Sequence, residues 1–337
     1  MSAASSSSAQ HWWSSRWFKI GLSLLLLAGL LYKTDLSDLL HAVTKANAWW
    51  MLLAIVGYVG SQAVSCFRWM MLARALGFSE PSGYFYGSYF TGMYMNLFAP
   101  STVAGDIGRA LLLAGTQRRK TLAFTTVLAD RALGFIALSW IGAFAIFTQP
   151  NYRLPAILYY GAWVIPPATL LGWLFGPPLV VRLFAPANRW RELVEHDLAP
   201  YWRDFGLLAK TSVVAVVFHS IQIVTQIFLA WALGLRVPFW YFFIFIPVVN
   251  VAGMLPISFS GIGIREYGYM YFLAKIGVAR HAGVAVGLLS SVVVLIAGLT
   301  GGLVFMLWKA EAPAPSIAGV EPATPEMGTE PEPQPQP

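Results

Sequence analysis

The sequence predicts an all-α, polytopic membrane protein with about six full spans and two opposed re-entrant helical hairpins, related by a pseudo-inverted repeat. Of its 337 residues, 57% are hydrophobic and only 11% are charged, whereas about a quarter of the residues of a soluble domain are charged. In addition, two hydrophobic blocks are much longer than the ~20 residues of one span. Both blocks contain proline, glycine and charged residues, which are costly in a simple bilayer-spanning helix.

The two interrupted blocks repeat one spacing, in which a proline is followed five residues later by a glycine and nine residues later by an arginine. One copy lies within residues 93–112 and the other within residues 253–272. Broken hydrophobic segments at corresponding places in two halves of a chain indicate the binding site of a transporter. The repeated residues are Pro100, Gly105 and Arg109 in the first copy, and Pro256, Gly261 and Arg265 in the second.

Three regions precede the first block. Residues 1–16 are rich in serine, and we expect them to form a disordered tail. The apolar run after Lys19 lacks the small-residue cleavage site of a signal peptide. Residues 17–33 are therefore predicted to be the first span, with its N-terminus in the cytoplasm. A second span is predicted at 48–67, ending at Arg68.

The first interrupted block, residues 83–117, has basic residues on both sides. Arg68 and Arg74 precede it, and the basic cluster 118–120 follows it. Because basic loops mark the cytoplasmic side, both ends of the block are predicted to lie there. The chain must then enter and leave the membrane on one side, as a re-entrant hairpin whose tip is formed by residues 100–105.

The middle of the chain predicts three spans and one polar segment. Pro166, Pro167, Pro177 and Pro178 in the second of these spans should kink or end it. Tryptophan and leucine among the charges of the polar segment predict a helix lying on the cytoplasmic surface. The spans are expected at 121–148, 155–180 and 211–234, and the polar segment at 182–210.

The second interrupted block, residues 238–277, is predicted to enter from the opposite, external side, so that the two hairpin tips meet near the middle of the membrane. A final span at 282–308 then returns the chain to the cytoplasm. Residues 310–337 are rich in proline and glutamate and have almost nothing apolar to bury, so we expect a disordered tail. The transmembrane domain is therefore predicted at 17–309.

The hairpin tips are the predicted substrate site. A helix that restarts after each tip points free N–H groups and its dipole at the tip, which attracts an anion. Arg109 and Arg265 add full charges, and a guanidinium group suits phosphate. Alternatively, these charges only hold the hairpins together, with Arg109 paired to Asp106. The second tip also contains Ser258, Ser260 and Gly263.

Other polar residues in the predicted spans are further candidates for the site, each with a structural alternative. Asp130 and Arg131 point about 100° apart, so each should reach a separate partner, in a hairpin or in the substrate. His219 either relays a proton or packs, and Gln222 and Gln226, which share its face, either line a cavity or join helices. The remaining candidates are Asn96 and Asn250, which either cap or bind, Glu266, which would balance charge, and Arg68, which either contacts a lipid phosphate or anchors a helix end.

Absent motifs exclude several other classes of protein. The single cysteine excludes an internal disulfide, and the five histidines show no metal-ligand spacing. The sequence has no Walker A loop and no hydrolase motif such as H-E-x-x-H or G-x-S-x-G. We therefore expect no metal and no cofactor, and basic loops beside the spans indicate topology and anionic lipid rather than nucleic acid.

Three motifs carry a resemblance to a known family. Residues 96–109 read N-L-x-x-P-x-x-x-x-G-D-x-x-R, residues 255–266 read L-P-I-S-x-S-G-I-G-I-R-E, and Asp130-Arg131 is an acidic–arginine pair. With them, the chain from about 15 to 308 resembles the lysylphosphatidylglycerol synthase transmembrane-domain family, also known as flippase-like. Ala104 departs from the glycine that the family often has at this position.

The resemblance implies a bacterial or archaeal inner-membrane protein that moves lipids across the bilayer. In the lysyl-lipid synthases the corresponding region is the flippase for the aminoacylated phospholipid, and stand-alone relatives are linked with isoprenoid, hopanoid or polyprenyl-linked glycolipid pathways. Aminoacyl transfer belongs to a separate soluble domain of those proteins. The short tail here has no such domain, so we expect no lysyltransferase activity and no enzyme.

Together these observations predict a flippase-like protein of the bacterial inner membrane, with both termini in the cytoplasm. It would translocate a phospholipid or an isoprenoid- or polyprenyl-linked lipid, whose anionic phosphate head group lies between the hairpin tips. One alternative is an intramembrane enzyme acting on a lipid-linked substrate, for which His219 and Glu266 are the best acid–base pair. The other is a non-transporting partner of a lipid-synthesis enzyme.

Overall fold

The computed structural model describes residues 44–98, 103–114, 117–149, 151–152, 154–185, 188–254 and 263–308, together with Ser37. Outside these ranges lie both predicted tails, the predicted span at 17–33, and the tip residues Pro100, Pro256, Ser258, Ser260 and Gly261. Within them, every regular element is a helix, which confirms the predicted all-α class.

Among the residues that the structure describes, five helices are long and apolar enough to cross a membrane. The shortest have 28 residues, or about 42 Å at 1.5 Å per residue, which exceeds the ~30 Å hydrocarbon core of a bilayer. They coincide with five of the six predicted spans. These helices are α3 (Ala48–Ala75), α6 (Gln117–Thr148), α7 (Ala156–Leu183), α10 (Phe205–Ala232) and α13 (Arg280–Leu307).

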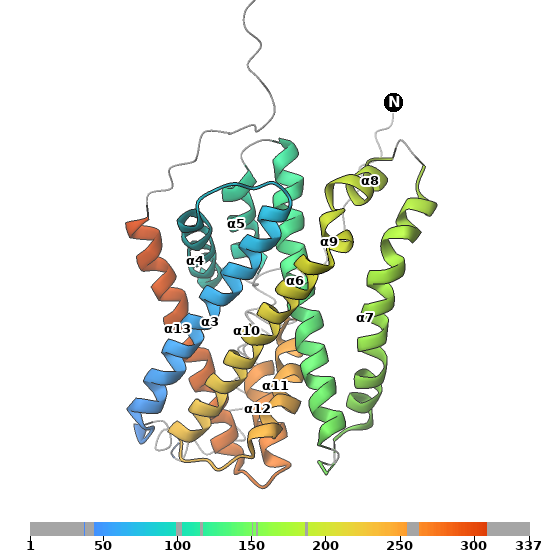
Figure 1. Cartoon of the computed structure of the whole chain (residues 1–337). Coiled ribbons are helices and arrows are strands. Elements are labelled where there is room, and N and C mark those ends of the chain that lie inside the picture. The colour runs from blue at the N-terminus through green and yellow to red at the C-terminus, as the bar shows by residue number, and fades with distance from the viewer. Residues whose placement is uncertain are drawn as a thin grey trace, which may run out of the picture.

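Each interrupted block contains a pair of antiparallel helices. The first pair is α4 (Ser82–Phe98) and α5 (Val103–Ala114), and the second is α11 (Phe239–Met254) and α12 (Ile264–Ala274). In the second pair the Tyr241 hydroxyl, near the start of α11, donates to the Phe272 carbonyl near the end of α12, at 2.7 Å. Figure 1 shows the first pair in the upper half of the molecule and the second in the lower half, as opposed hairpins require.

Helices of one half of the fold pack against helices of the other half. A long helix, a short pair and a second long helix occur twice, as α3 to α6 and as α10 to α13. α4 packs against α13 of the other half, and its counterpart α11 packs against α6, while α3 and α10 make the most extensive contact at the centre (Figure 1). This reciprocal packing is the arrangement expected of an inverted repeat.

Glycines allow the helices to approach closely at these contacts. A Cβ atom on Gly301 of α13 would lie only 2.2 Å from the Phe90 carbonyl oxygen of α4. On the same helix, a Cβ atom on Gly287 would lie 2.8 Å from the Cα atom of Glu266 in α12. Small residues are common where membrane helices touch, because they bring the backbones together. α13 thus packs tightly against both hairpins.

One predicted helix end is wrong, and one of the two effects expected of the prolines in α7 is not found. α3 continues past Arg68 to Ala75, so Arg68 is inside the helix and buried rather than an anchor at its end. α7 is not ended by its prolines and runs on to Leu183. The Thr169 hydroxyl donates a hydrogen bond to the Pro166 carbonyl at 2.8 Å, which is a side-chain bond to the preceding turn of the helix.

The predicted surface helix at 182–210 is also wrong, because the segment is broken into short pieces. Pro200 has no N–H group to continue a preceding helix, and the Asp204 side chain accepts a hydrogen bond from the Leu207 amide at 2.9 Å, which starts α10. The pieces are α8 (Arg189–Glu192), the π-helix η2 (Leu193–Asp197) and α9 (Pro200–Arg203).

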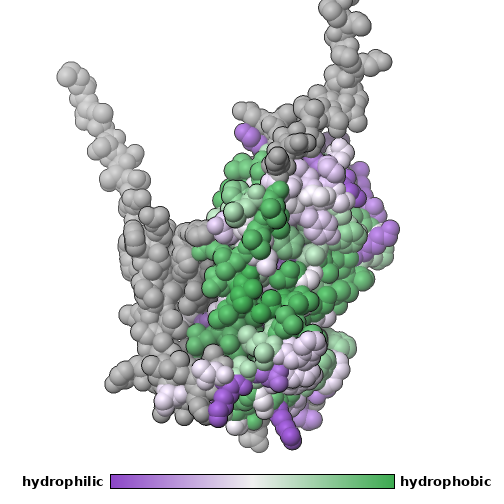
Figure 2. Space-filling view, turned by 90° about the vertical axis from the view of Figure 1, so that its left-hand side faces the viewer, coloured by the Kyte–Doolittle hydropathy of each residue, from purple (hydrophilic) through white to green (hydrophobic). Residues whose placement is uncertain are grey.

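The outer surface suits a membrane. Figure 2 shows the face on the side of α13, where an apolar band lies between hydrophilic residues at the two ends of the molecule. Exposed α13 residues such as Val292, Leu295, Leu299 and Leu303 belong to this surface. The hydrocarbon core of a bilayer requires such a band.

Candidate functional site

A cavity of about 790 Å³ lies where the α4–α5 hairpin meets α3, α6, α10, α12 and α13. Its polar side chains come mostly from α3, α4, α5, α6 and α10, and its apolar side chains come mostly from α13. Asn250 and Glu266 do not line it. The predicted substrate residues that do are Arg68, Asn96, Asp106, Arg109, Asp130, Arg131, His219, Gln222 and Arg265.

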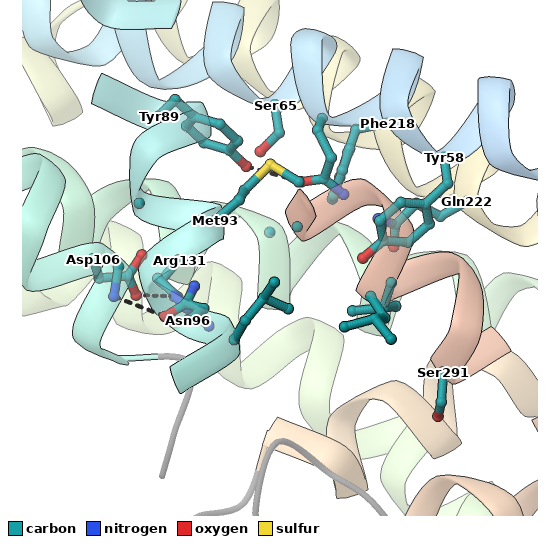
Figure 3. Close-up of a pocket in the computed structure, with 18 of the residues that line it drawn as sticks. Tyr58, Ser65, Tyr89, Met93, Asn96, Asp106, Arg131, Phe218, Gln222 and Ser291 are labelled. Atoms are coloured by element: carbon teal, nitrogen blue, oxygen red, sulfur yellow. Dashed lines mark hydrogen bonds and ion pairs between the residues drawn. The ribbon is translucent and has the colours of Figure 1, made fainter. Parts of the chain in front are cut away.

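A polar stripe on α3 forms one wall of the cavity. Tyr58, Gln62, Ser65 and Arg68 follow one another at intervals of four, three and three residues. This spacing places all four on one helix face. Figure 3 shows Tyr58 beside Gln222 of α10, and Ser65 beside Tyr89 and Met93 of α4.

Asp130 of α6 joins two arginines from different helices. Its Oδ1 atom is 2.7 Å from Arg68 Nε of α3, and its Oδ2 atom is 3.1 Å from Arg109 Nη2 of α5. All three residues are at most 5% exposed. Attraction between charges is strong at such depth, but each charge also loses its hydration. The carboxylate therefore offsets two buried positive charges and connects the hairpin to the long helices.

Asp106 extends this set of ion pairs to the edge of the cavity. It forms an ion pair with Arg109 Nη2 at 3.0 Å and accepts a hydrogen bond from Arg131 Nε. Figure 3 shows the contact between Asp106 and Arg131. Asp130 and Arg131 thus each reach a partner in the first hairpin, as predicted, and the pairing of Arg109 with Asp106 is also confirmed.

Two aromatic rings contact Arg109, and a side-chain cap stabilises the start of α5, the helix that carries it. The guanidinium carbon of Arg109 lies 4.8 Å from the centre of the Trp69 ring and 5.0 Å from that of Tyr89, which are cation–π distances. The Asn96 side chain accepts a hydrogen bond from the Gly105 amide at 2.7 Å, so it caps the first turn of α5. Arg109 is therefore held by two carboxylates and two aromatic rings of this half of the fold, while its Nε and Nη1 atoms are buried without a hydrogen-bond partner among the described residues.

Arg265, the counterpart of Arg109 in the sequence repeat, has a different environment. It is half-buried in the cavity wall near Tyr58 and Tyr269, and it forms no ion pair within the part of the chain that the structure describes. Four arginines and two aspartates line the cavity, which gives a formal charge of +2 with His219 neutral. This surplus makes the cavity complementary to an anion.

Glu266 and Gln226 connect helices instead of facing the cavity. Glu266 is fully buried and accepts hydrogen bonds from the Gly263 amide at 2.6 Å and from the Ser291 hydroxyl of α13 at 2.7 Å. Gly263 has a φ angle of +85°, which favours glycine at the start of α12. Gln226 accepts from the Tyr269 hydroxyl at 2.8 Å and so joins α10 to α12.

The structure does not bring the alternative acid–base pair together as a site. His219 lines the cavity, whereas Glu266 does not, and the two carboxylate oxygens of Glu266 accept hydrogen bonds from Gly263 and Ser291. In the described ranges, no three histidine, cysteine, aspartate or glutamate side chains gather as metal ligands would. The arginines, aspartates and amide side chains that line the cavity can recognise charge and hydrogen-bonding groups.

Several lining residues were not predicted from the sequence. Tyr58, Gln62 and Ser65 could have been found from their helical spacing with Arg68. Tyr89 and Gly134 give no such signal, because the first belongs to an aromatic-rich helix and the second is one glycine among many. The apolar wall formed by Leu288, Leu289, Val292 and Leu295 reads in the sequence as an ordinary span.

The helices, the opposed hairpins and a cavity lined by polar and apolar side chains define a multi-pass membrane protein with a candidate binding site inside its transmembrane domain. Residues 16–302 match the family described as lysylphosphatidylglycerol synthase TM region, and the chain belongs to this family. The motifs that carry the resemblance contribute Asn96, Asp106, Arg109, Asp130, Arg131 and Arg265 to the cavity.

The chain is also similar to the protein named glycosyltransferase AglD of Haloferax volcanii. The two are 22% identical over 334 residues, which is 85% of this chain and 53% of that protein. The chain therefore spans about half the length of this curated relative. Family and relative together indicate a lipid-related function in a membrane.

Proposed function

We propose that this protein is a flippase-like transporter that moves an anionic lipid across the membrane, with the head group passing through the central cavity. The observation that carries the proposal is Arg265, a cation in the cavity wall with no ion pair among the described residues. A guanidinium group in this position binds phosphate through two parallel hydrogen bonds. The net positive formal charge of the residues that line the cavity also favours an anionic head group.

The two-sided character of the cavity supports a lipid as the ligand. Arg265 and the α3 stripe offer polar groups to a head group, while Leu288, Val292 and Leu295 of α13 offer an apolar surface. Val292 and Leu295 are also exposed on the outside of the molecule. An acyl or isoprenoid chain can therefore remain in the hydrocarbon while the head group enters the cavity.

The opposed hairpins supply a mechanism for access from both sides. In our proposal both pairs are re-entrant, and the half formed by α3 to α6 rocks against the half formed by α10 to α13 around the bound head group. We place the protein in the inner membrane of a bacterium. Basic residues such as Arg74, Lys120, Arg203 and Lys210 gather at one end of the molecule, which we assign to the cytoplasm (Figure 1). We propose that both termini are cytoplasmic too.

Replacing Arg265 by glutamine tests this proposal. The purified protein is placed in phosphatidylcholine vesicles with traces of fluorescent phosphatidylglycerol or fluorescent polyprenyl phosphate, and movement between leaflets is followed by quenching. The loss of a charge-assisted hydrogen bond of about 1.5–3 kcal/mol should slow translocation about 10- to 100-fold. Thermal stability should be unchanged, because Arg265 makes no ion pair with the described residues.

The matched control is Arg236→Gln, which removes an exposed arginine from the loop before α11 and should leave the rate unaltered. Failure of the native protein to move either lipid would contradict transport, and equal rates for native protein and Arg265→Gln would contradict the site. Mass spectrometry of the recovered lipids tests the enzyme alternative, because we propose that the chain moves the lipid unchanged.

A further inference from the structure

The acidic groups of the cavity are all paired with arginines of the protein itself. Asp106 and Asp130 are the carboxylates among the described lining residues. The two oxygens of Asp130 contact Arg68 Nε at 2.7 Å and Arg109 Nη2 at 3.1 Å. Those of Asp106 contact Arg109 Nη2 at 3.0 Å and Arg131 Nε. Because each of the four carboxylate oxygens already faces a guanidinium group, a positively charged group of a ligand would have to compete for it.

Two aromatic rings of the cavity are occupied in the same way. An ammonium group that finds no carboxylate can still bind over the face of an aromatic ring. The Arg109 guanidinium carbon, however, lies 5.0 Å from the centre of the Tyr89 ring. The guanidinium carbon of Arg68 lies 5.4 Å from the centre of the Phe218 ring. A ligand ammonium group would therefore meet a cation at both rings.

Tyr58 carries the third ring among the described lining residues, and its surroundings are positive. It lies close to Arg265, which forms no ion pair within the part of the chain that the structure describes. The tip residues outside that part, 99–102 and 255–262, include no aspartate or glutamate in the sequence. Like charges repel strongly in a site shielded from water. This end of the cavity therefore favours an anion and disfavours a cation.

The α3 stripe also offers uncharged hydrogen-bonding groups to a ligand. Gln62 lines the cavity, and its Oε1 atom accepts a hydrogen bond from the Tyr89 hydroxyl at 3.2 Å. Gln222 of α10 lines the cavity beside Tyr58 (Figure 3). Amide and phenol groups both donate and accept hydrogen bonds, so they suit hydroxyl groups. The cavity thus combines one cation without a counter-ion with several neutral polar side chains.

We propose that this cavity selects a head group whose phosphate ester carries only uncharged hydroxyl groups, and that it rejects aminoacylated head groups. The phosphate binds Arg265, and the hydroxyl groups bind the amides of Gln62 and Gln222. An aminoacyl ester adds ammonium groups, for which the described lining residues provide no free counter-charge. The inference rests on the transport function proposed above. It distinguishes the ligand from lysylphosphatidylglycerol, the lipid in the description of the family.

Phosphatidylglycerol and lysylphosphatidylglycerol are a matched pair of probes, because they share the phosphate and the glycerol and differ only in the lysyl ester. The native protein is placed in phosphatidylcholine vesicles with a trace of either lipid, labelled with the same fluorophore on an acyl chain. Movement between leaflets is followed by quenching. Since like charges in a binding site are strongly unfavourable, phosphatidylglycerol should move at least about tenfold faster. Equal rates, or faster movement of the lysyl lipid, would overturn the inference and leave transport standing.

Gln62→Glu supplies the carboxylate that the α3 stripe lacks. The two side chains have the same shape, and glutamate can still accept the hydrogen bond from the Tyr89 hydroxyl. The variant should lower the preference for phosphatidylglycerol about tenfold. Gln149→Glu is the control, because it makes the same change after the end of α6 and outside the cavity, and it should keep the native preference. A Gln62→Glu protein with native Tm and native preference would overturn selection by the stripe.

A binding measurement separates this inference from transport. If neither lipid moves in vesicles, the proposed transport is wrong, and head-group preference is decided by titration calorimetry in detergent with the dihexanoyl forms of the two lipids. Binding of phosphatidylglycerol that is at least about tenfold tighter supports the inference even then. Equal affinity for the two lipids, or no binding of either, overturns it.

Discussion

Replacing Asp130 by asparagine should destabilise the transmembrane domain more than any other single charge change. The substitution keeps the shape of the side chain but leaves Arg68 without a counter-ion among the described residues, and it leaves Arg109 with Asp106 alone. Removing one partner of a buried ion pair costs about 3–5 kcal/mol. Thermal unfolding of the purified protein in detergent, followed by tryptophan fluorescence, should therefore show a large fall in Tm.

Two further variants separate this effect from a general loss of negative charge. Glu192→Gln removes an exposed carboxylate on α8 and should leave Tm almost unchanged. Arg68→Gln combined with Asp130→Asn removes the cation that lost its partner, so the double variant should be more stable than the sum of the single changes predicts. A native Tm in Asp130→Asn would rule out a stabilising role for the ion pairs.

Replacing Gly301 by alanine should separate α13 from the first hairpin. The added Cβ atom would lie 2.2 Å from the Phe90 carbonyl oxygen, which belongs to the backbone and cannot rotate away. Overpacking of a tight contact typically costs about 1–3 kcal/mol, and a backbone clash belongs at the upper end of that range. A lower Tm and a loss of translocation are expected together, because α13 carries the apolar wall of the cavity.

Gly172→Ala on α7 is the control for this change. Nothing lies within 4 Å of a Cβ atom at that position, so the better helix propensity of alanine should keep or slightly raise Tm. A Gly301→Ala protein with native Tm and native translocation would show that α4 and α13 need not pack as closely as the structure places them.

The fold was largely accessible from the sequence, because the bilayer limits the choices. Hydrophobic length and basic loops were enough to predict five of the long helices and the opposition of the two short pairs. The same reasoning failed at Arg68, since a span of about 20 residues seemed to end there. The helix continues because Asp130, 62 residues further along the chain, neutralises that arginine. No local pattern reveals such a partner.

The sequence predicted many of the residues of the site, but it did not predict what each of them contacts. The repeat treats Arg109 and Arg265 as equivalents, yet the first contacts two aspartates and two aromatic rings, whereas the second contacts no acidic group in the described ranges. Which arginine has a counter-ion depends on how α5 and α6 pack.

The helix between the two halves has a consequence for how the chain acquires its symmetry. α6 and α10 both run downwards in Figure 1, and α7 rises between them. Without that single return crossing, the second half would insert with the same orientation as the first, and the hairpins would enter from one side. α7 therefore reverses the orientation of the second half relative to the first. For this it must be long and apolar enough to cross the membrane, but it need not pack closely against other helices. This explains why Pro166, Pro167, Pro177 and Pro178 are compatible with it.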